Sequence, residues 1–221
     1  KVGELLDVLD QTGLADNTVV IFASDHGDML CEKEMVQKRS LYEPSCRVPF
    51  IVSFPDGWKG GTITQMPVSL IDLLPTFCEI AGEDASLPHD GESLMGLLEN
   101  EPEDRIVFAQ AHEAVGVPCL MARQGEYKYT YIHGSEDQLF DIQTDPGEWT
   151  NLIGNDDQNA IAEGLRGKIL ERFDPDRMAS ENLESLYRRA YIHKGMTENG
   201  TYWDHFPDFN ARRGALDQYL R

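Results

Sequence analysis

The sequence is poor in basic residues, and this shortage excludes some partners. Lysine and arginine together number 19 against 39 aspartates and glutamates, and the formal net charge is −20. A chain this acidic repels nucleic acid and anionic membranes, so neither is bound by general charge attraction. An anionic substrate would need a metal ion or a few well-placed cations to offset the repulsion.

Paired cysteines and long apolar runs are also lacking. The four cysteines are scattered without a C-x-x-C pair, which argues against a zinc ribbon and favours a reducing compartment such as the cytoplasm. No apolar run approaches the ~20 residues that a membrane-spanning helix needs, and no signal peptide opens the chain. The chain starts inside a helical pattern without methionine, so we expect a piece of a longer protein.

The first half of the sequence alternates helical and strand patterns. Residues 2–9 place apolar side chains on one helical face, and Gly13 is a plausible C-cap. The runs TVVIFAS (18–24) and VPFIVSFP (48–55) are typical of strands buried on both faces. Residues 69–82 predict a helix. This alternation predicts an α/β fold with a parallel sheet.

The pattern changes near Arg105. Four short strand-like runs between 105 and 143 predict a small antiparallel sheet, followed by a turn at 144–148. Helical spacing recurs over 159–173 and 181–195. We therefore expect three segments: half of the main α/β domain (1–104), an antiparallel-sheet subdomain (105–155), and a helical C-terminal extension with a tail (156–221).

Two metal-binding residue types follow the first predicted strand. In α/β folds, ligands bind outside the carboxyl ends of the strands, where Asp25 and His26 stand. A carboxylate and an imidazole there could bind a divalent cation. The alternative is that Asp25 caps a turn and His26 is a hydrogen-bonded loop histidine, since D-H-G alone is a weak signal.

The next loop adds a cation. Lys38 lies twelve residues after His26 and could hold an oxygen of a sulfate or phosphate as a point charge. The alternative is a solvated surface lysine. In the same loop, Glu43 and Arg47 are expected to form a structural ion pair that fixes the loop before the next strand.

A collinear set of motifs resembles the C-terminal half of a sulfatase of the alkaline phosphatase superfamily. The resemblance covers about residues 1 to 155 and rests on LADNTVVIFASDHGDML, Lys38, YEPSCRVPFIV, VSLIDLLPTFCEIAG, LPHDGESLMGLL and ARQGEYKYTYIHGSEDQLFDIQTDPGEWTNL. It implies the second half of an alkaline-phosphatase-like parallel sheet sandwiched by helices. A small antiparallel sheet with a helix and a C-terminal tail would follow.

The resemblance also implies a chemistry. Sulfatases of this family carry a formylglycine made from Cys or Ser in a C/S-x-P/A-x-R motif, and a divalent cation, usually Ca²⁺, with Mn²⁺ or Mg²⁺ as alternatives. Asp25 and His26 match the family's late metal-ligand pair, and Lys38 matches the lysine that contacts the sulfate. The cation and the lysine would offset charge on the sulfuryl oxygens.

The nucleophile motif itself is missing from the chain. Cys119 comes closest, because Arg123 has the right offset, but Met121 stands where Pro or Ala belongs. The family places the motif, with two more metal-binding aspartates, toward the N-terminus, so we expect both before Lys1. The chain alone is therefore predicted not to hydrolyse a sulfate ester.

The segments FAQAHEAVGVPCLMARQGEYKY, RRAYIHKG and NGTYWDHFP resemble those of choline sulfatases. In that family the C-terminal extension reaches a neighbouring subunit of a homo-oligomer. A quaternary ammonium substrate suits carboxylates and aromatic rings. The resemblance makes Glu113, Trp203 and Asp204 candidates for substrate binding, and His112 a residue of the site or of the core. Glu113 as a surface carboxylate and Trp203 as a packing anchor are the alternatives.

Two other functions compete with a sulfatase of this type. A phosphonate monoester or phosphodiester hydrolase of the same superfamily would share the D-H-G turn and a similar lysine loop. A non-catalytic acidic binding module could keep the fold, but it would have no need for Asp25, His26 and Lys38 together.

Overall fold

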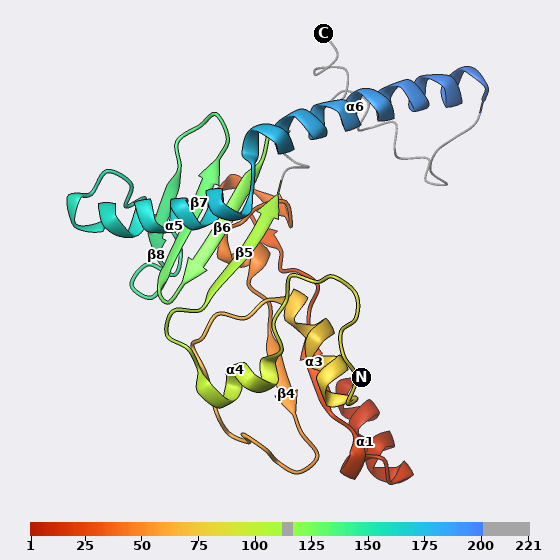
Figure 1. Ribbon diagram of the computed structural model, residues 1–221. Helices are drawn as coiled ribbons and strands as arrows, with labels where there is room; N and C mark the ends of the chain where they lie inside the picture. The colour runs from red at the N-terminus through yellow and green to blue at the C-terminus, as the bar shows by residue number, and fades with distance from the viewer. Residues whose placement is uncertain (112–116, 201–221) are drawn as a thin grey trace. The chain divides into compact units, whose positions relative to one another are not determined.

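The computed structural model describes residues 1–111 and 117–200 (Figure 1). The chain forms two compact units, residues 1–175 and 176–221, which are described separately. The proposed division into three segments stays a prediction. Within the described residues, no helix combines the length and apolar character needed to span a membrane.

The first part of unit 1 holds the α/β elements. These are α1 (Val2–Thr12), β1 (Val20–Ala23), β2 (Met29–Leu30), β3 (Val36–Gln37), α2 (Glu43–Cys46), β4 (Phe50–Ser53), α3 (Leu73–Ile80) and α4 (Leu94–Asn100), with short 3-10 turns at Ala15–Asn17, Glu32–Glu34 and Leu70–Asp72. The helix predicted over the first residues is confirmed, and Gly13 ends it in the left-handed conformation, with φ 70°.

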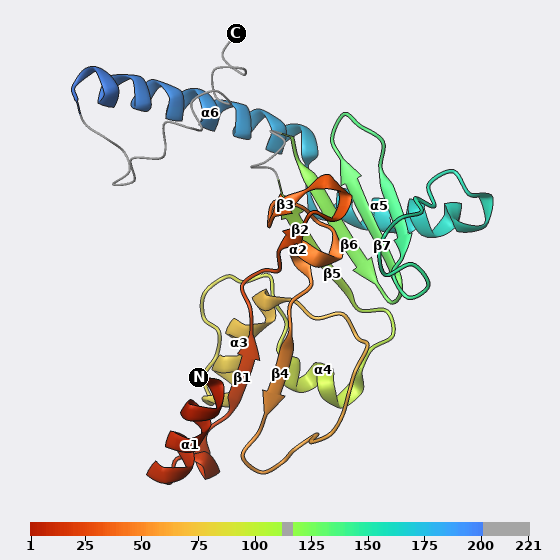
Figure 2. The same cartoon turned by 180° about the vertical axis from the view of Figure 1, so that it is seen from behind.

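The pairing of β1 with β4 differs from the prediction. The two strands are antiparallel, with Val20 opposite Ser53 and Ala23 opposite Phe50, so the expected parallel pairing is wrong here. A parallel neighbour needs a crossover that returns the chain to the other end of the sheet. Residues 24–49 instead stay at the carboxyl end of β1, where they form a β2–β3 hairpin and α2 (Figure 2).

The predicted burial of these two strands on both faces is also wrong in this structure. Phe22 of β1 is 44% exposed and Ile51 of β4 is 63% exposed. Among the described residues each strand pairs with one neighbour, because β1 and β4 form a two-stranded sheet. Both strands therefore keep apolar side chains and one edge each uncovered.

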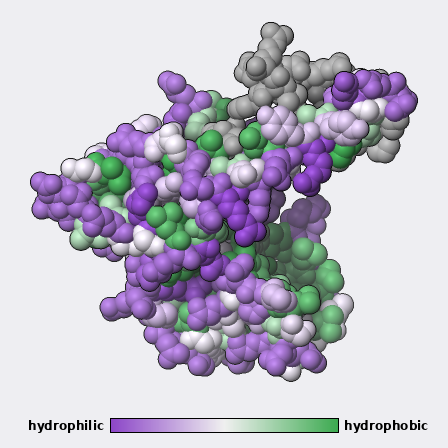
Figure 3. Space-filling model, turned by 45° about the horizontal axis from the view of Figure 1, so that its top comes forward, coloured by the Kyte–Doolittle hydropathy of each residue, from purple (hydrophilic) through white to green (hydrophobic). Residues whose placement is uncertain are grey.

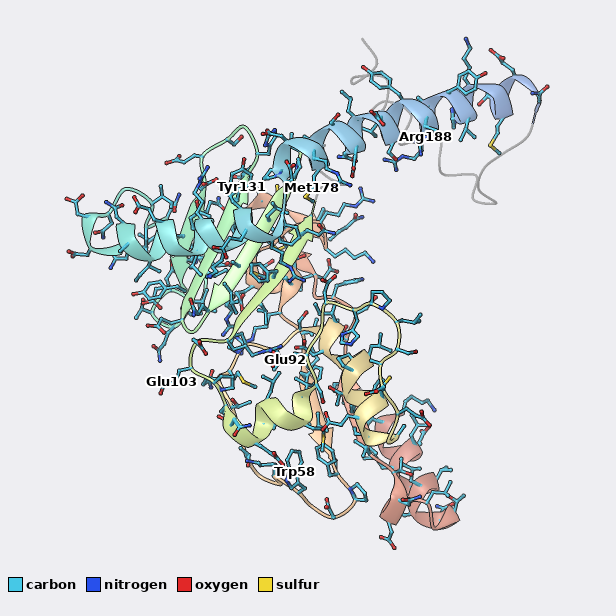
Figure 4. The ribbon with its side chains drawn as sticks, viewed as in Figure 1. Trp58, Glu92, Glu103, Tyr131, Met178 and Arg188 are labelled. Carbon is cyan, nitrogen blue, oxygen red and sulfur yellow. The ribbon has the colours of Figure 1, made fainter. Side chains whose placement is uncertain are left out.

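A buried arginine ties α3 to the start of the second sheet. Asp72, which is 1% exposed, accepts from Arg105 Nη2 at 2.6 Å and from the backbone N–H of Ser69 at 2.8 Å. Arg105 Nη1 donates to Glu92, whose side chain is labelled in Figure 4, at 2.7 Å. Because both carboxylates pair with one guanidinium, the helix start and the first residues of the sheet are held together.

The predicted antiparallel sheet is confirmed. Its four strands are β5 (Ile106–Ala111), β6 (Cys119–Gln124), β7 (Tyr127–Ile132) and β8 (Gln138–Asp141), in the spatial order β5-β6-β7-β8. Helix α5 (Asn159–Arg172) packs on β6 and β7 and buries Leu165 and Ile169 against them. Figures 1 and 2 show α5 on one face of this sheet and the β2–β3 hairpin with α2 on the other.

Unit 2 is described as far as residue 200 and consists of α6 (Pro175–Glu198). The helix confirms the pattern predicted over 181–195. Exposed ion pairs one turn apart, Arg177 with Glu181 and Lys194 with Glu198, stabilise it weakly.

Candidate metal and anion site

The turn after β1 is locked by its own polar groups. The Ser24 hydroxyl donates to the carbonyl oxygen of His26 at 2.9 Å, and the backbone N–H of His26 donates to Asp25 Oδ1 at 3.0 Å. Gly27 continues the turn by donating its N–H to the carbonyl oxygen of Ser45 at 2.8 Å. The side chains of Asp25 and His26 are thereby directed to the same side.

The His26 ring is held in one tautomer. Its Nδ1 lies 2.7 Å from the carbonyl oxygen of Gly27, so Nδ1 carries the proton and donates. The lone pair of Nε2 is then free to accept a hydrogen bond or to bind a metal. Nε2 lies 3.3 Å from Asp25 Oδ2, so an oxygen and a nitrogen ligand converge.

Lys38 joins this pair through the β2–β3 hairpin. In the hairpin, Met29 pairs with Gln37 and Leu30 with Val36, which returns the chain to the turn after twelve residues. Lys38 Nζ lies 2.7 Å from His26 Nε2, and because an ammonium only donates, Nε2 accepts. The structure thus brings together the three residues that the sequence singled out.

The electrostatics favour an anionic Asp25. Desolvation raises the pKa of its carboxyl, but the backbone N–H of His26 and the hydroxyl of Ser24 lower the pKa below its usual value of 3.8. The Asp25 side chain is 81% exposed and that of His26 37% exposed, so solvent and a ligand can reach both.

The donor set fits a divalent cation but does not complete its shell. A carboxylate oxygen suits Ca²⁺, Mg²⁺ and Mn²⁺, and an imidazole nitrogen suits ions of intermediate softness. Within the described ranges 1–111 and 117–200, no group of three or more His, Cys, Asp or Glu side chains could hold a metal. Further ligands would have to come from elsewhere.

The other predicted site residues lie outside the described residues. His112 and Glu113 fall in the segment 112–116, and Trp203 and Asp204 fall in 201–221. Their assignments to the substrate therefore stay predictions.

The structure explains why the D-H-G turn contains a glycine, which the sequence did not reveal. A Cβ atom on Gly27 would stand 2.1 Å from the carbonyl oxygen of Pro44 and 3.2 Å from that of Arg47. The backbone of α2 therefore lies directly against the turn, at a distance that only glycine permits.

The expected Glu43–Arg47 ion pair is wrong. Glu43 is 8% exposed, and its carboxylate pairs instead with Lys128 Nζ at 3.0 Å. Glu148 pairs with the same ammonium at 2.8 Å, and its side chain is 1% exposed. Lys128 and Glu148 were not predicted from the sequence. The available signal was a lysine in the middle of the strand pattern YKYTYI, because a lysine buried in a strand requires a carboxylate partner.

Comparisons with known proteins identify the family of the chain. Residues 31–174 match the family model described as N-sulphoglucosamine sulphohydrolase, C-terminal. The choline-sulfatase of Rhizobium meliloti (strain 1021) is 35% identical over 100% of this chain and 44% of its own length.

Solved structures give the same result at the level of the fold. The structure of a 2-O GAG sulfatase has a TM-score of 0.68 and 29% identity, covering 83% of this chain and 41% of that one. A phosphonate monoester hydrolase from Silicibacter pomeroyi has a TM-score of 0.66 and 25% identity, covering 77% and 37%.

This chain spans less than half the length of each of these three proteins. The resemblance drawn from the sequence motifs is confirmed, as is the alkaline-phosphatase-like α/β class. The chain belongs to the sulfatase family and corresponds to its C-terminal part.

Proposed function

We propose that this chain is the C-terminal part of an enzyme that hydrolyses a sulfate ester. The observation that carries the proposal is the convergence of Asp25, His26 and Lys38. His26 Nε2 lies 3.3 Å from Asp25 Oδ2 and 2.7 Å from Lys38 Nζ. A carboxylate, an imidazole and an ammonium at one strand end suit a metal-assisted reaction of an anion.

Asp25 and His26 are proposed as two ligands of a divalent cation. When bound, the cation would draw negative charge from the sulfate oxygens. The resemblance favours Ca²⁺, with Mn²⁺ or Mg²⁺ as alternatives that the carboxylate of Asp25 also suits. The hydrogen bond from His26 Nδ1 to Gly27 fixes the tautomer in which Nε2 can bind it.

Lys38 is proposed to hold the sulfate. Its ammonium donates to His26 Nε2, the nitrogen that a cation would take, and two cations cannot share one lone pair. With a cation bound at Nε2, the ammonium would have to leave this nitrogen, and Lys38 would then be available to donate to a sulfate oxygen as a point charge. Lys38 would thus donate to His26 Nε2 in the absence of a metal ion and to the sulfate in its presence.

The nucleophile is proposed to come from another part of the protein. Cys119 lies in β6 between Ala111 of β5 and Ile132 of β7, and Met121 interrupts its motif. We propose that a formylglycine in a preceding N-terminal portion supplies the reactive group, together with the remaining metal ligands.

An uncovered apolar surface supports this N-terminal partner. Apolar side chains of α1, β1, β4 and α3 are at least 39% exposed, namely Val2, Leu5, Leu6, Val8, Phe22, Ile51, Leu74, Phe77 and Ile80. Figure 3 shows hydrophobic side chains gathered at the surface of this part of unit 1. Because β1 and β4 each have one edge that no described strand pairs with, further strands could extend their sheet and cover these side chains.

Choline sulfate is the favoured substrate. The alignment with the choline-sulfatase covers 100% of the chain and so includes its C-terminal tail, whereas that with the arylsulfatase K of Danio rerio covers 68%. We propose that Glu113, Trp203 and Asp204 bind the quaternary ammonium, the last two from a neighbouring subunit of a homo-oligomer. The cytoplasm stays the predicted compartment.

Hydrolysis of a phosphonate monoester is the second candidate. The phosphonate monoester hydrolase superposes nearly as well as the 2-O GAG sulfatase, with TM-scores of 0.66 and 0.68. A metal ion and a lysine can offset charge on either anion, so the geometry alone favours neither.

The test is hydrolysis by the protein produced with all of the sequence that its gene encodes. Choline sulfate, 4-nitrophenyl sulfate and a phenyl phosphonate ester are compared in the parent, in Lys38→Ala, and in Lys168→Ala as an exposed-lysine control. The proposal is supported if the parent and Lys168→Ala hydrolyse choline sulfate in preference to the other esters and Lys38→Ala does not hydrolyse it. Preference for the phosphonate supports the second candidate, and no hydrolysis of any ester supports the binding module.

A further inference from the structure

A buried charge cluster lies on the face of the antiparallel sheet opposite α5. At its centre is Lys128 of β7, which is 1% exposed, with carboxylate oxygens of Glu148 and Glu43 at 2.8 and 3.0 Å. Tyr129, the next residue of the strand, bonds Asp137, which pairs with Arg166 of α5. Neighbouring side chains of a strand point to opposite faces, so Lys128 faces away from α5.

Glu148 holds the start of α2. Besides pairing with Lys128, it accepts the backbone N–H of Glu43 through Oε2 at 2.7 Å. Glu148 sits in the turn after β8 with φ 54°, a conformation that non-glycine residues adopt at a cost. A four-residue helix such as α2 cannot maintain itself, so its position depends on contacts of this kind.

Helix α2 in turn holds the turn that carries Asp25 and His26. The carbonyl oxygen of Ser45 accepts the N–H of Gly27 at 2.8 Å, and that of Pro44 lies where a Gly27 side chain would begin. Displacement of α2 would therefore move the backbone next to His26.

The turn after β8, which contains Glu148, also holds the β2–β3 hairpin that leads to Lys38. Lys33, between β2 and β3, donates from Nζ to the carbonyl oxygen of Glu148. Its ammonium lies 4.0 Å from the ring centre of Trp149 and 5.1 Å from that of Tyr42, which adds cation–π attraction. Glu148 thus holds α2 through its side chain and the β2–β3 hairpin through its backbone carbonyl oxygen.

We infer that Glu148 is a positioning residue that sets the geometry of Asp25, His26 and Lys38 through α2 and the β2–β3 hairpin. That this geometry serves sulfate hydrolysis rests on the proposed function. The positioning itself does not, because it concerns contacts within the chain.

Glu148→Gln tests the inference with little change in size. A carboxylate accepts on both oxygens, but an amide offers one acceptor and one donor. Whichever way the new amide turns, its NH₂ group faces either the ammonium of Lys128 or the N–H of Glu43. One of the two contacts is lost, and the negative charge is lost with it.

The first readout is hydrogen exchange, followed by mass spectrometry, of the segment 25–30 relative to strand β6. The second is the resonance of the His26 Cε1–H group in protein labelled at histidine. Both are recorded in the protein produced with all of the sequence that its gene encodes. The control is Ile169→Val, which removes a methylene from the α5 face, where Ile169 is 0% exposed, without touching α2.

In Glu148→Gln we expect segment 25–30 to exchange about tenfold faster, the effect of losing one charge-assisted hydrogen bond. The His26 resonance should shift, while Ile169→Val leaves both readouts unchanged. Equal effects of the two variants, or none, would overturn the inference. If Glu148→Gln does not fold, Glu148→Asp, which keeps the negative charge but is too short to reach both Lys128 and the N–H of Glu43, is judged by the same comparison. Neither readout needs turnover, so an enzyme inactive on sulfate esters would refute the proposed function and leave this inference standing.

Discussion

Lys38 Nζ lies 2.7 Å from His26 Nε2, and the lysine therefore occupies the nitrogen that a metal ion would bind. Metal binding and this hydrogen bond exclude each other. At the proposed metal site, this relationship would make the affinity for the ion depend on a residue that is not itself a ligand.

The first prediction concerns this competition. In the protein produced with all of its encoded sequence, Lys38→Met should bind Ca²⁺ or Mn²⁺ more tightly, because no ammonium competes for Nε2 or repels the ion. His26→Ala should weaken binding at least about tenfold. Removal of a residue that only hydrogen-bonds to a metal ligand already lowers metal affinity by about that factor. Titration calorimetry measures both. Equal affinity in the parent and Lys38→Met would contradict the competition.

Gly27→Ala should destabilise the protein by about 1–3 kcal/mol, because the new Cβ would stand 2.1 Å from the carbonyl oxygen of Pro44. Urea unfolding measures the change. The matched control is Gly167→Ala in α5, where a Cβ would meet nothing within 4 Å. That substitution should stabilise the helix by about 0.5–1 kcal/mol. A neutral Gly27→Ala would mean that α2 does not abut the turn.

Lys128→Met should cost about 3–5 kcal/mol, because it leaves the carboxylates of Glu43 and Glu148 buried without a cation. Lys168→Met removes a lysine of an exposed ion pair on α5 and should change stability by less than about 1 kcal/mol. The free energy of unfolding in urea distinguishes the two. Similar small losses in both variants would refute the buried cluster.

The same lysine predicts a pH dependence. Burial lowers the pKa of Lys128, but the charges of Cys46, Glu43 and Glu148 raise it by more, so its pKa in the folded protein exceeds 10.5. The cation is therefore favoured more in the folded than in the unfolded chain. Its contribution to stability is complete below pH 10.5 and is lost as the pH rises through the higher, folded value.

Urea unfolding of the parent and of Lys128→Met at increasing pH measures this contribution as the difference in unfolding free energy. The difference should be constant up to about pH 10 and shrink above it. A difference that shrinks already near neutral pH would contradict the raised pKa.

Removal of the residues after Gly195 should lower kcat/KM for choline sulfate roughly 2- to 30-fold, the range expected for a lost cation–π contact. Activity on 4-nitrophenyl sulfate, which has no ammonium group, should be retained. Full activity on choline sulfate after the deletion would refute a role of the tail in substrate binding and leave it a role in assembly alone.

The sequence predicted the elements well because their signals are local. The apolar spacing in α1 and the short alternating runs of β5–β8 follow from neighbouring residues and were confirmed. The direction of β4 relative to β1 was not predictable in this way, since it depends on whether residues 24–49 cross the sheet or stay at one end.

The site was predicted in part for the same reason. Asp25, His26 and Lys38 stand in a recognisable order, and the hairpin brings them together. Glu148 escaped prediction because it is far from these residues in the sequence, and its effect passes through the backbone of α2. Glu43 was expected to pair with Arg47 of its own loop, but it pairs with Lys128, a buried lysine of the four-stranded sheet.

The placement of Lys33 over the indole of Trp149 has an optical consequence. A positive charge 4.0 Å from the ring centre perturbs the excited state of an indole whose residue is otherwise 71% exposed. With Trp58 and Trp203 replaced by phenylalanine, the fluorescence of Trp149 reports whether the hairpin is docked. The protein thus contains an intrinsic probe with which docking of the lysine-bearing loop can be followed in real time.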